Sequence, residues 1–293
     1  MVSPTDESSN KFIQAGALMC NPRAGETTDP YRIFTSRVHS FWHFIGRIYK
    51  VASRMDETLD SLSEIYKFDR NDLMRYSDRL TEDRGIIGEL LLTRTTDAFL
   101  TYVSRLLGLL FREKPEILQN VVTVPLAAVL NAPDKDSIIG YAVDKYVQDL
   151  SYKSLRDLYR DIKNKCDFQL FTDVAVLNTA VEAVGLRNVI VHNNSVVDER
   201  LARDAAKYGN SIGHVATQYN ALDMMSTLIL AAFDIDTRAR AKWGLPQGVL
   251  KVSHECHIYE NDIEANERRT RVLAHVRKSH TESNENETQT IAE

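Results

Sequence analysis

Cysteine is scarce in this sequence, and long hydrophobic runs are absent. The 293 residues include three cysteines, Cys20, Cys166 and Cys256, which are odd in number and widely spaced. This usage excludes a disulfide-stapled scaffold and indicates free thiols in a reducing compartment. No segment approaches the roughly 20 apolar residues of a membrane-spanning helix, and residues 1–10 lack the apolar run of a signal peptide. We therefore expect a soluble cytoplasmic protein with no membrane partner.

An excess of positive charge is also missing. The composition is ordinary for a globular chain, with 43% hydrophobic and 26% charged residues, and the formal net charge is −5. A mildly acidic chain does not present a broad phosphate-binding surface, so a general nucleic-acid coating protein is disfavoured. Any contact with a nucleic acid must be local.

Several common catalytic and metal-binding motifs are lacking as well. The chain has no Gly-rich phosphate loop, CxxC pair or nucleophile elbow. His39 and His43 are four residues apart but have no acidic partner in a HExxH arrangement, so packing is the favoured interpretation. His254, Cys256 and His257 form a tighter cluster, but a structural zinc site needs four ligands. We expect no metal and no cofactor.

Apolar residues recur at helical spacing along most of the chain. Residues 1–28 are polar and aperiodic, which predicts disorder, and Asp29-Pro30 then suits a helix start. Residues 29–70 are predicted to form one long N-terminal helix. Its apolar seam advances in alternating steps of four and three residues, as in a coiled coil: Phe34, Val38, Phe41, Ile45, Ile48, Ala52, Met55, Leu59 and Leu62. This helix is either a long core helix or one shared with another subunit.

The same N-terminal helix is basic. It carries Arg32, Arg37, Arg47, Lys50 and Arg54. Such a charge run is usually a solvated face, and guidance of RNA is the alternative interpretation.

Residues 71–245 are predicted to form the main helical domain. A polar stretch at 68–84 leads into a helix at 89–111, a helical region near residue 134, a helix at 152–162 that Ser154 and Asp157 suit as a capping box, one at 168–192 and a last one at 211–243, which Gly244 ends. Two of these helices carry predicted core stripes: Leu92, Thr96, Phe99, Val103, Leu106 and Leu110 in the helix at 89–111, and Phe171, Val174, Leu177, Val181 and Val184 in the helix at 168–192. Gly185 interrupts the helix at 168–192, which indicates close approach of another helix. Residues 246–293 are expected to be a short irregular segment, with strand-like alternation at 250–258, and a polar tail. The fold class is therefore all-α, a helical bundle with a long N-terminal seam helix.

The run from Arg187 to Asn194 carries the residues best suited to catalysis. Arg187 offers a rigid fork of donors for a phosphate. His192 suits proton transfer, since the unperturbed pKa of histidine is about 6.5. RNA can be cut without a metal when its 2′-hydroxyl attacks the phosphorus, a base takes the hydroxyl proton and an acid protonates the leaving 5′-oxygen. The bare pair also fits a helix end where His192 meets the helix dipole and Arg187 is solvated or salt-bridged.

Helical geometry constrains this candidate site. Asn188 and His192 are four residues apart and share a helix face, whereas Arg187 and His192 lie about 140° apart around the axis. Arg187 must therefore reach round, or the helix must loosen near Asn193. Asn188 is placed to hydrogen-bond His192 or the substrate. One histidine cannot readily act as both base and acid on opposite sides of one phosphorus, so we expect a symmetric dimer.

The residues around the pair resemble the signature of the HEPN superfamily. That signature is an arginine, four to six residues and a histidine, often with asparagine directly after the arginine. Here it corresponds to the run from Arg187 to Asn194, followed by Val-Val-Asp-Glu-Arg at 196–200. The stretches 89–111 and 152–162 fit an early and a middle helix of such a domain, so the resemblance covers about residues 85–240.

The resemblance implies a metal-independent endoribonuclease with a composite dimer site, acting in defence, toxin–antitoxin systems or RNA processing. RNA, a second copy of the chain and an antitoxin or effector protein are the implied partners. By position, Arg187 and His192 would be the catalytic pair and Asn188 a supporting polar residue. The alternatives are a non-catalytic HEPN-like module that binds RNA, nucleotide or a protein, and a helical scaffold in which the pair is structural.

Further candidates for the site flank the pair or lie earlier in the chain. An acidic or polar residue on an earlier helix often belongs to the HEPN pattern, and Asp97 or Glu89 could occupy that place. We predict that Asn193, Asn194 and Asp97 contribute to substrate binding.

Overall fold

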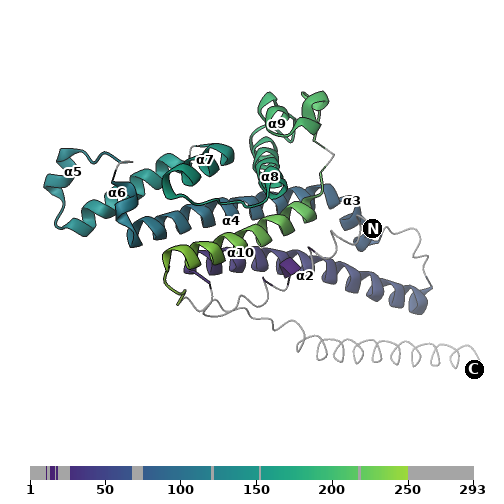
Figure 1. Cartoon of the computed structure of the whole chain (residues 1–293). Helices are drawn as coiled ribbons and strands as arrows, with labels where there is room; N and C mark the ends of the chain where they lie inside the picture. The colour runs from purple at the N-terminus through teal and green to yellow at the C-terminus, as the bar shows by residue number, and fades with distance from the viewer. Residues whose placement is uncertain are drawn as a thin grey trace, which may run out of the picture. The chain divides into compact units, whose positions relative to one another are not determined.

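The computed structural model describes residues 11, 14–16, 18, 27–67, 75–119, 122–151, 153–216 and 219–249. Among these residues every regular element is a helix, and a single bridge between Val196 and Val215 is the sole β pairing. The predicted all-α class is confirmed. The described residues divide into two compact units: those up to 42 and from 86 to 249 form the first, and those from 43 to 85 form the second. Figure 1 shows the helices with their labels.

Some predictions fall outside the described residues. They include most of the expected disordered segment 1–28, the strand-like stretch 250–258 and the polar tail to residue 293. Cys20, Cys256 and the histidines at 254 and 257 also lie there.

The core of the first unit is built on α4 (Arg84–Glu113) and α10 (Ala221–Trp243), which are joined where the Tyr102 hydroxyl donates to the carbonyl of Ala232. The predicted apolar stripe of α4 is fully buried: Leu92, Thr96, Phe99, Val103, Leu106 and Leu110. The start of α2 (Asp29–Tyr66) packs on the same core, with the Phe34 and Tyr102 ring centroids 5.6 Å apart. Phe34 and Val38 are buried, as a core helix requires.

Smaller helices complete this unit. The Ser154 side chain caps α7 by accepting from the backbone N–H of Asp157, as the sequence predicts. The short helices α5, α9 and η3 have no strong periodicity and were not expected. The bounds are η2 Pro115–Leu118, α5 Leu126–Asn131, α6 Lys135–Ser151, α7 Leu155–Cys166, α8 Val174–His192, α9 Glu199–Asp204 and η3 Ala206–Ser211.

Helix α8, which carries the motif, begins later than predicted. The expected start at Phe168 is wrong, because Asp173 caps the helix by accepting from the backbone N–H of Ala175 and leaves residues 168–173 outside it. Val174, expected on the core stripe, is instead 71% exposed at the open first turn. Phe168 and Phe171 are buried, but they lie in a non-helical segment before α8.

Gly185 lies where another helix approaches α8 closely, as its position in the sequence predicts. A Cβ atom on this residue would lie 2.8 Å from Cδ1 of Leu201 on α9. Such a distance is shorter than any ordinary carbon contact. The glycine therefore lets α9 pack directly on the motif helix.

Helix α10 also starts later than expected. The predicted start at Ser211 is wrong, because Gly213 adopts a φ of 81° and Asn220 caps the helix by accepting from the backbone N–H of Asp223. The end is as predicted: Gly244 adopts a φ of 64° and its N–H bonds to the carbonyl of Arg240.

Helix α8 is the one described helix whose length and apolar character would allow it to cross a membrane. These criteria are weak by themselves, because core helices also meet them. In the first unit α8 contacts α7, α9 and α10. We therefore describe it as a core helix.

The second unit contains the later part of α2 and a short helix within the stretch expected to be a polar spacer. This helix, α3 (Tyr76–Glu82), begins where the Asp56 carboxylate accepts from the backbone N–H groups of Tyr76 and Ser77, at 2.8 and 2.9 Å. The Tyr49 hydroxyl donates to the carbonyl of Leu80. Side chains of α2 thus cap the start of α3 and bind its backbone near the end.

Candidate active site

The guanidinium of Arg187 is held by a carboxylate from a different helix. Its Nε donates to Oδ1 of Asp97 on α4 at 2.7 Å, and the side chains are 25% and 38% exposed. An ion pair this accessible contributes only about 0–1 kcal/mol to stability. Its main effect is to orient the guanidinium. Of the two acidic candidates, Asp97 is thus the one that the structure brings to Arg187.

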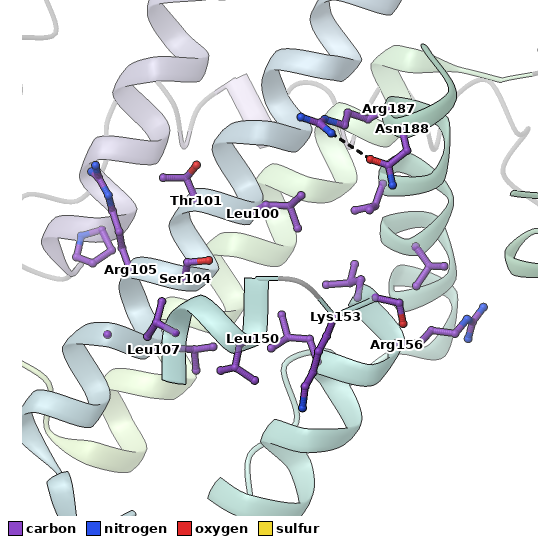
Figure 2. A pocket seen from close by; sticks show the side chains of 18 of the residues that line it. Leu100, Thr101, Ser104, Arg105, Leu107, Leu150, Lys153, Arg156, Arg187 and Asn188 are labelled. Atoms are coloured by element: carbon purple, nitrogen blue, oxygen red, sulfur yellow. Dashed lines mark hydrogen bonds between the residues drawn. The ribbon is translucent and has the colours of Figure 1, made fainter. Parts of the chain in front are cut away.

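Asn188 lies beside the arginine and contacts it directly. Nη1 of Arg187 donates to Oδ1 of Asn188 at 3.1 Å, which Figure 2 marks with a dashed line. Of the two partners predicted for Asn188, His192 or the substrate, His192 forms no hydrogen bond with it among the described residues. With Nε and Nη1 engaged, the remaining N–H groups of Arg187 have no partner in the described part of the chain, and a guanidinium offers five in all.

His192 is the last residue of α8, and its side chain is exposed. The helix stays regular through His192, so it does not loosen to bring the imidazole toward Arg187. Within the described residues no hydrogen bond or ion pair joins these two side chains. Arg187 faces α4, whereas His192 faces outward, as their separation around the axis predicts.

The two asparagines that follow His192 form the exit turn of the helix. The backbone N–H of Asn193 bonds to the carbonyl of Val189, and its side-chain Nδ2 donates to the carbonyl of Val196. Asn194 has a φ of 48°, which places it in the left-handed region. Both asparagines are exposed. They are therefore accessible to a ligand but also serve the turn itself.

A second link between α4 and the motif closes this turn. Ser195 also has a positive φ, 62°, and is buried, and its hydroxyl donates to Oε1 of Glu89 at 2.7 Å. The Ser195 N–H bonds to the carbonyl of Val189, and its carbonyl accepts from Ala216. Consecutive left-handed non-glycine residues are costly and persist only where the surroundings fix them. The Glu89–Ser195 bond is one of the contacts that fix the turn beside His192.

A cavity of about 880 Å³ opens next to Arg187 and Asn188. Its walls come from α4, α6, α7, α8 and α9 and from the start of α2, all within the first unit. Figure 2 shows Arg187 and Asn188 on α8 across from Thr101, Ser104 and Arg105 on α4. Its volume is typical of sites that hold a small molecule or one unit of a polymer.

Metal ligands do not gather at this site. Among the described residues no group of three or more His, Cys, Asp or Glu side chains is placed to hold a metal ion. His39 is buried, which agrees with the packing role expected for it. Cys166 is free and buried, and burial raises the pKa of its thiol to about 11. A thiol with that pKa is a poor nucleophile near neutral pH.

Sequence reasoning missed three contributors to this region: the bond between Ser195 and Glu89, and the cavity-lining Thr101 and Ser104. Besides its buried apolar stripe, α4 carries a second stripe, which is polar. Asp97, Thr101 and Ser104 recur at steps of four and three and thus share a face. That polar stripe on an apolar helix was a readable signal for the wall of a site. No pattern in the sequence indicated the hydrogen bond between Ser195 and Glu89.

No protein-family model matches this chain, and no match was found among curated proteins or solved structures.

Proposed function

We propose that this protein is a metal-independent endoribonuclease of the HEPN type. One observation carries the proposal: Asp97 holds Arg187 by its Nε, so that the outer N–H groups stay available beside a cavity, while His192 is exposed at the end of the same helix. An oriented cation with free donors suits the charge that develops on the phosphate oxygens during cleavage. An exposed imidazole suits proton transfer at neutral pH.

The reaction follows from these groups. The 2′-oxygen forms a bond to the adjacent phosphorus as the bond from phosphorus to the 5′-oxygen breaks, giving a cyclic 2′,3′-phosphate and a 5′-hydroxyl. An imidazole removes the 2′-hydroxyl proton, and an imidazolium returns a proton to the leaving 5′-oxygen. Arg187 neutralises the phosphate oxygens, and Asn188 keeps the guanidinium in place through its Oδ1. No oxidation or reduction is involved.

Among the described residues the one other exposed histidine is His214, which lies outside the motif, so the motif supplies one histidine per chain. We therefore propose a homodimer in which two His192 side chains meet at one phosphate. The exposed position of His192 at the end of α8 supports this, since a two-fold axis near a helix end can bring two copies together. A cytoplasmic location and an antitoxin or effector partner belong to the same proposal.

The test is cleavage of single-stranded RNA in EDTA by the purified protein. His192→Ala should lower the rate about 10²–10⁴-fold, the usual contribution of a general acid or base. His214→Ala is the matched control and should retain the wild-type rate. Activity should also fall faster than linearly on dilution as the dimer dissociates. Equal rates for wild type and His192→Ala would refute the mechanism.

A second candidate function is a non-catalytic module that binds RNA, nucleotide or a protein partner. The observation that favours it is the lack of any hydrogen bond between Arg187 and His192 within the described residues, with Arg187 engaged by Asp97 instead. This candidate predicts RNA binding that depends on Arg187 and no cleavage above background in the same assay.

A further inference from the structure

The cavity beside Arg187 has more basic than acidic side chains on its walls, although the whole chain is acidic. Three aspartates line it, Asp29, Asp144 and Asp204, and the basic residues are Arg105, Arg112, Lys153, Arg156, Arg187 and Arg200. A cavity with this charge on a protein of net charge −5 attracts a negatively charged ligand.

Only some of these cations are available to a ligand. Arg112 pairs with Asp144 at 2.8 Å, and the guanidinium of Arg156 donates to Oδ1 of Asn178 at 3.0 Å. Lys153 pairs with an aspartate on α7. By contrast, Arg105 and Arg200 have no hydrogen bond or ion pair among the described residues.

The rest of the wall is apolar with a few hydroxyl groups. Thr101 and Ser104 face the cavity from α4, and the amide of Asn188 lies at its end. Most of the remaining surface is leucine and valine, including Leu100, Leu107, Leu150, Leu155, Val181 and Val184. Such a wall suits a flat, partly apolar body with polar edges. A body of that kind that also carries phosphate is a nucleotide.

We propose that this cavity binds the nucleotide next to the scissile phosphate of an RNA chain. The base packs on the leucine and valine wall, with the hydroxyls of Thr101 and Ser104 at its polar edge. Arg187 holds the scissile phosphate, and Arg105 holds a second phosphate of the same strand. Arg105 is eight residues beyond Asp97, the partner of Arg187, or about 12 Å along α4. The inference rests on the proposed function, because it takes Arg187 to mark the scissile phosphate.

The experiment measures binding of a fluorescein-labelled single-stranded oligoribonucleotide to the intact chain carrying His192→Ala, so that binding is read without cleavage. Arg105→Gln should weaken binding about five- to tenfold at 0.1 M salt. It should also reduce the slope of log K against log salt by about 0.7, the value for one lost phosphate contact on a single strand. Ser104→Trp, which fills the cavity, should weaken binding at least tenfold and leave the salt slope unchanged.

The control is Arg160→Gln. Arg160 lies on α7, outside the cavity, and its exposed pair with Asp157 contributes little. This variant should bind RNA with the wild-type affinity and salt slope. Thermal unfolding of each variant verifies the fold, and a reduced salt slope with unchanged melting cannot come from misfolding.

The outcomes separate the two proposals. If wild-type protein cleaves RNA but Arg105→Gln and Ser104→Trp bind it normally, the cavity inference is overturned and the proposed function stands. If the cavity variants lose RNA binding while wild type and the His192→Ala protein cleave equally, the cavity inference stands and the mechanism fails. A nucleoside monophosphate that binds the cavity and is not displaced by RNA would overturn the RNA chain as its ligand.

Discussion

Asp97 and Asp236 each tie one helix to another, in opposite surroundings. Asp236 on α10 is fully buried, and it accepts from the backbone N–H of Thr28 at 2.9 Å and from the Thr28 hydroxyl at 2.5 Å, at the start of α2. Asp97 is 38% exposed and holds Nε of Arg187, which also bonds to Asn188 and keeps further N–H groups beside a cavity. The first carboxylate uses its bonding capacity inside the protein and supports the fold. The second positions the guanidinium of Arg187, which still has N–H groups available to donate to a ligand.

The largest expected effect is on RNA cleavage and comes from breaking the partly exposed pair of Asp97 and Arg187. Arg187→Ala should lower kcat/KM for RNA cleavage about 10²–10³-fold, because the donors to the developing charge on the phosphate are lost. The free energy of unfolding should change by less than about 1 kcal/mol, since the pair is partly exposed. Cleavage kinetics and urea unfolding measure the two quantities. A large loss of stability with unchanged kcat/KM would place Arg187 among structural residues.

The buried carboxylate should show the reverse pattern. Asp236→Ala leaves the N–H and hydroxyl of Thr28 without an acceptor, and we expect the free energy of unfolding to fall by about 3 kcal/mol. The rate per folded molecule should stay at the wild-type value. The control is Asp234→Ala on the same helix, whose pair with Arg238 is 49% exposed at the carboxylate and should cost less than about 1 kcal/mol. Equal destabilisation by both variants would contradict the contrast.

The pH dependence of stability sharpens the same comparison. Burial raises the pKa of Asp236, and the hydrogen bonds from Thr28 oppose this only in part. The folded state therefore holds this proton to higher pH than the unfolded chain, where a carboxyl pKa is about 3.9. As pH rises above that value, the Asp236 contribution to the free energy of unfolding falls by up to about 1.4 kcal/mol per pH unit. The destabilisation by Asp236→Ala should thus be larger near pH 4 than near pH 7.

Other carboxyls contribute to the pH dependence of stability with the opposite sign. The effect of Asp236 is therefore measured as the difference in the free energy of unfolding between wild type and the Asp236→Ala variant. The pKa of Asp161 is lowered, mainly by its hydrogen bond from Lys153, and that of Asp134 is lowered by Ser137. Their contributions are present above the ordinary carboxyl pKa and are lost as pH falls, in both proteins alike. A wild-type minus variant difference that grows with rising pH would contradict the account of Asp236.

Local patterns in the sequence predicted what local physics determines. The buried stripe of α4, the cap at Ser154 and the stop at Gly244 depend on residues a few positions apart. The pairing of Thr28 with Asp236 joins residues 208 positions apart, and no periodicity encodes it.

The candidate site was predictable to the same extent. The motif gave Arg187, Asn188 and His192, but the choice between Asp97 and Glu89 needed the fold. Both lie on α4, two turns apart, and each contacts a different part of the motif. The late start of α8 was not predicted, because Phe168 and Phe171 are buried although they are not helical. Apolar residues at helical spacing indicate burial, and burial does not require a helix.

The smallest expected effect concerns the link that holds the exit turn beside His192. Ser195→Ala removes the hydroxyl that donates to Glu89 and should cost about 1 kcal/mol of stability. If the link positions His192, kcat should fall several-fold while KM changes less. Ser195→Gly makes a matched variant: it relieves the positive φ of 62° but also lacks the hydroxyl. Both variants should lose kcat equally if the hydroxyl matters, whereas full activity in the glycine variant would show that only the backbone conformation of the turn counts.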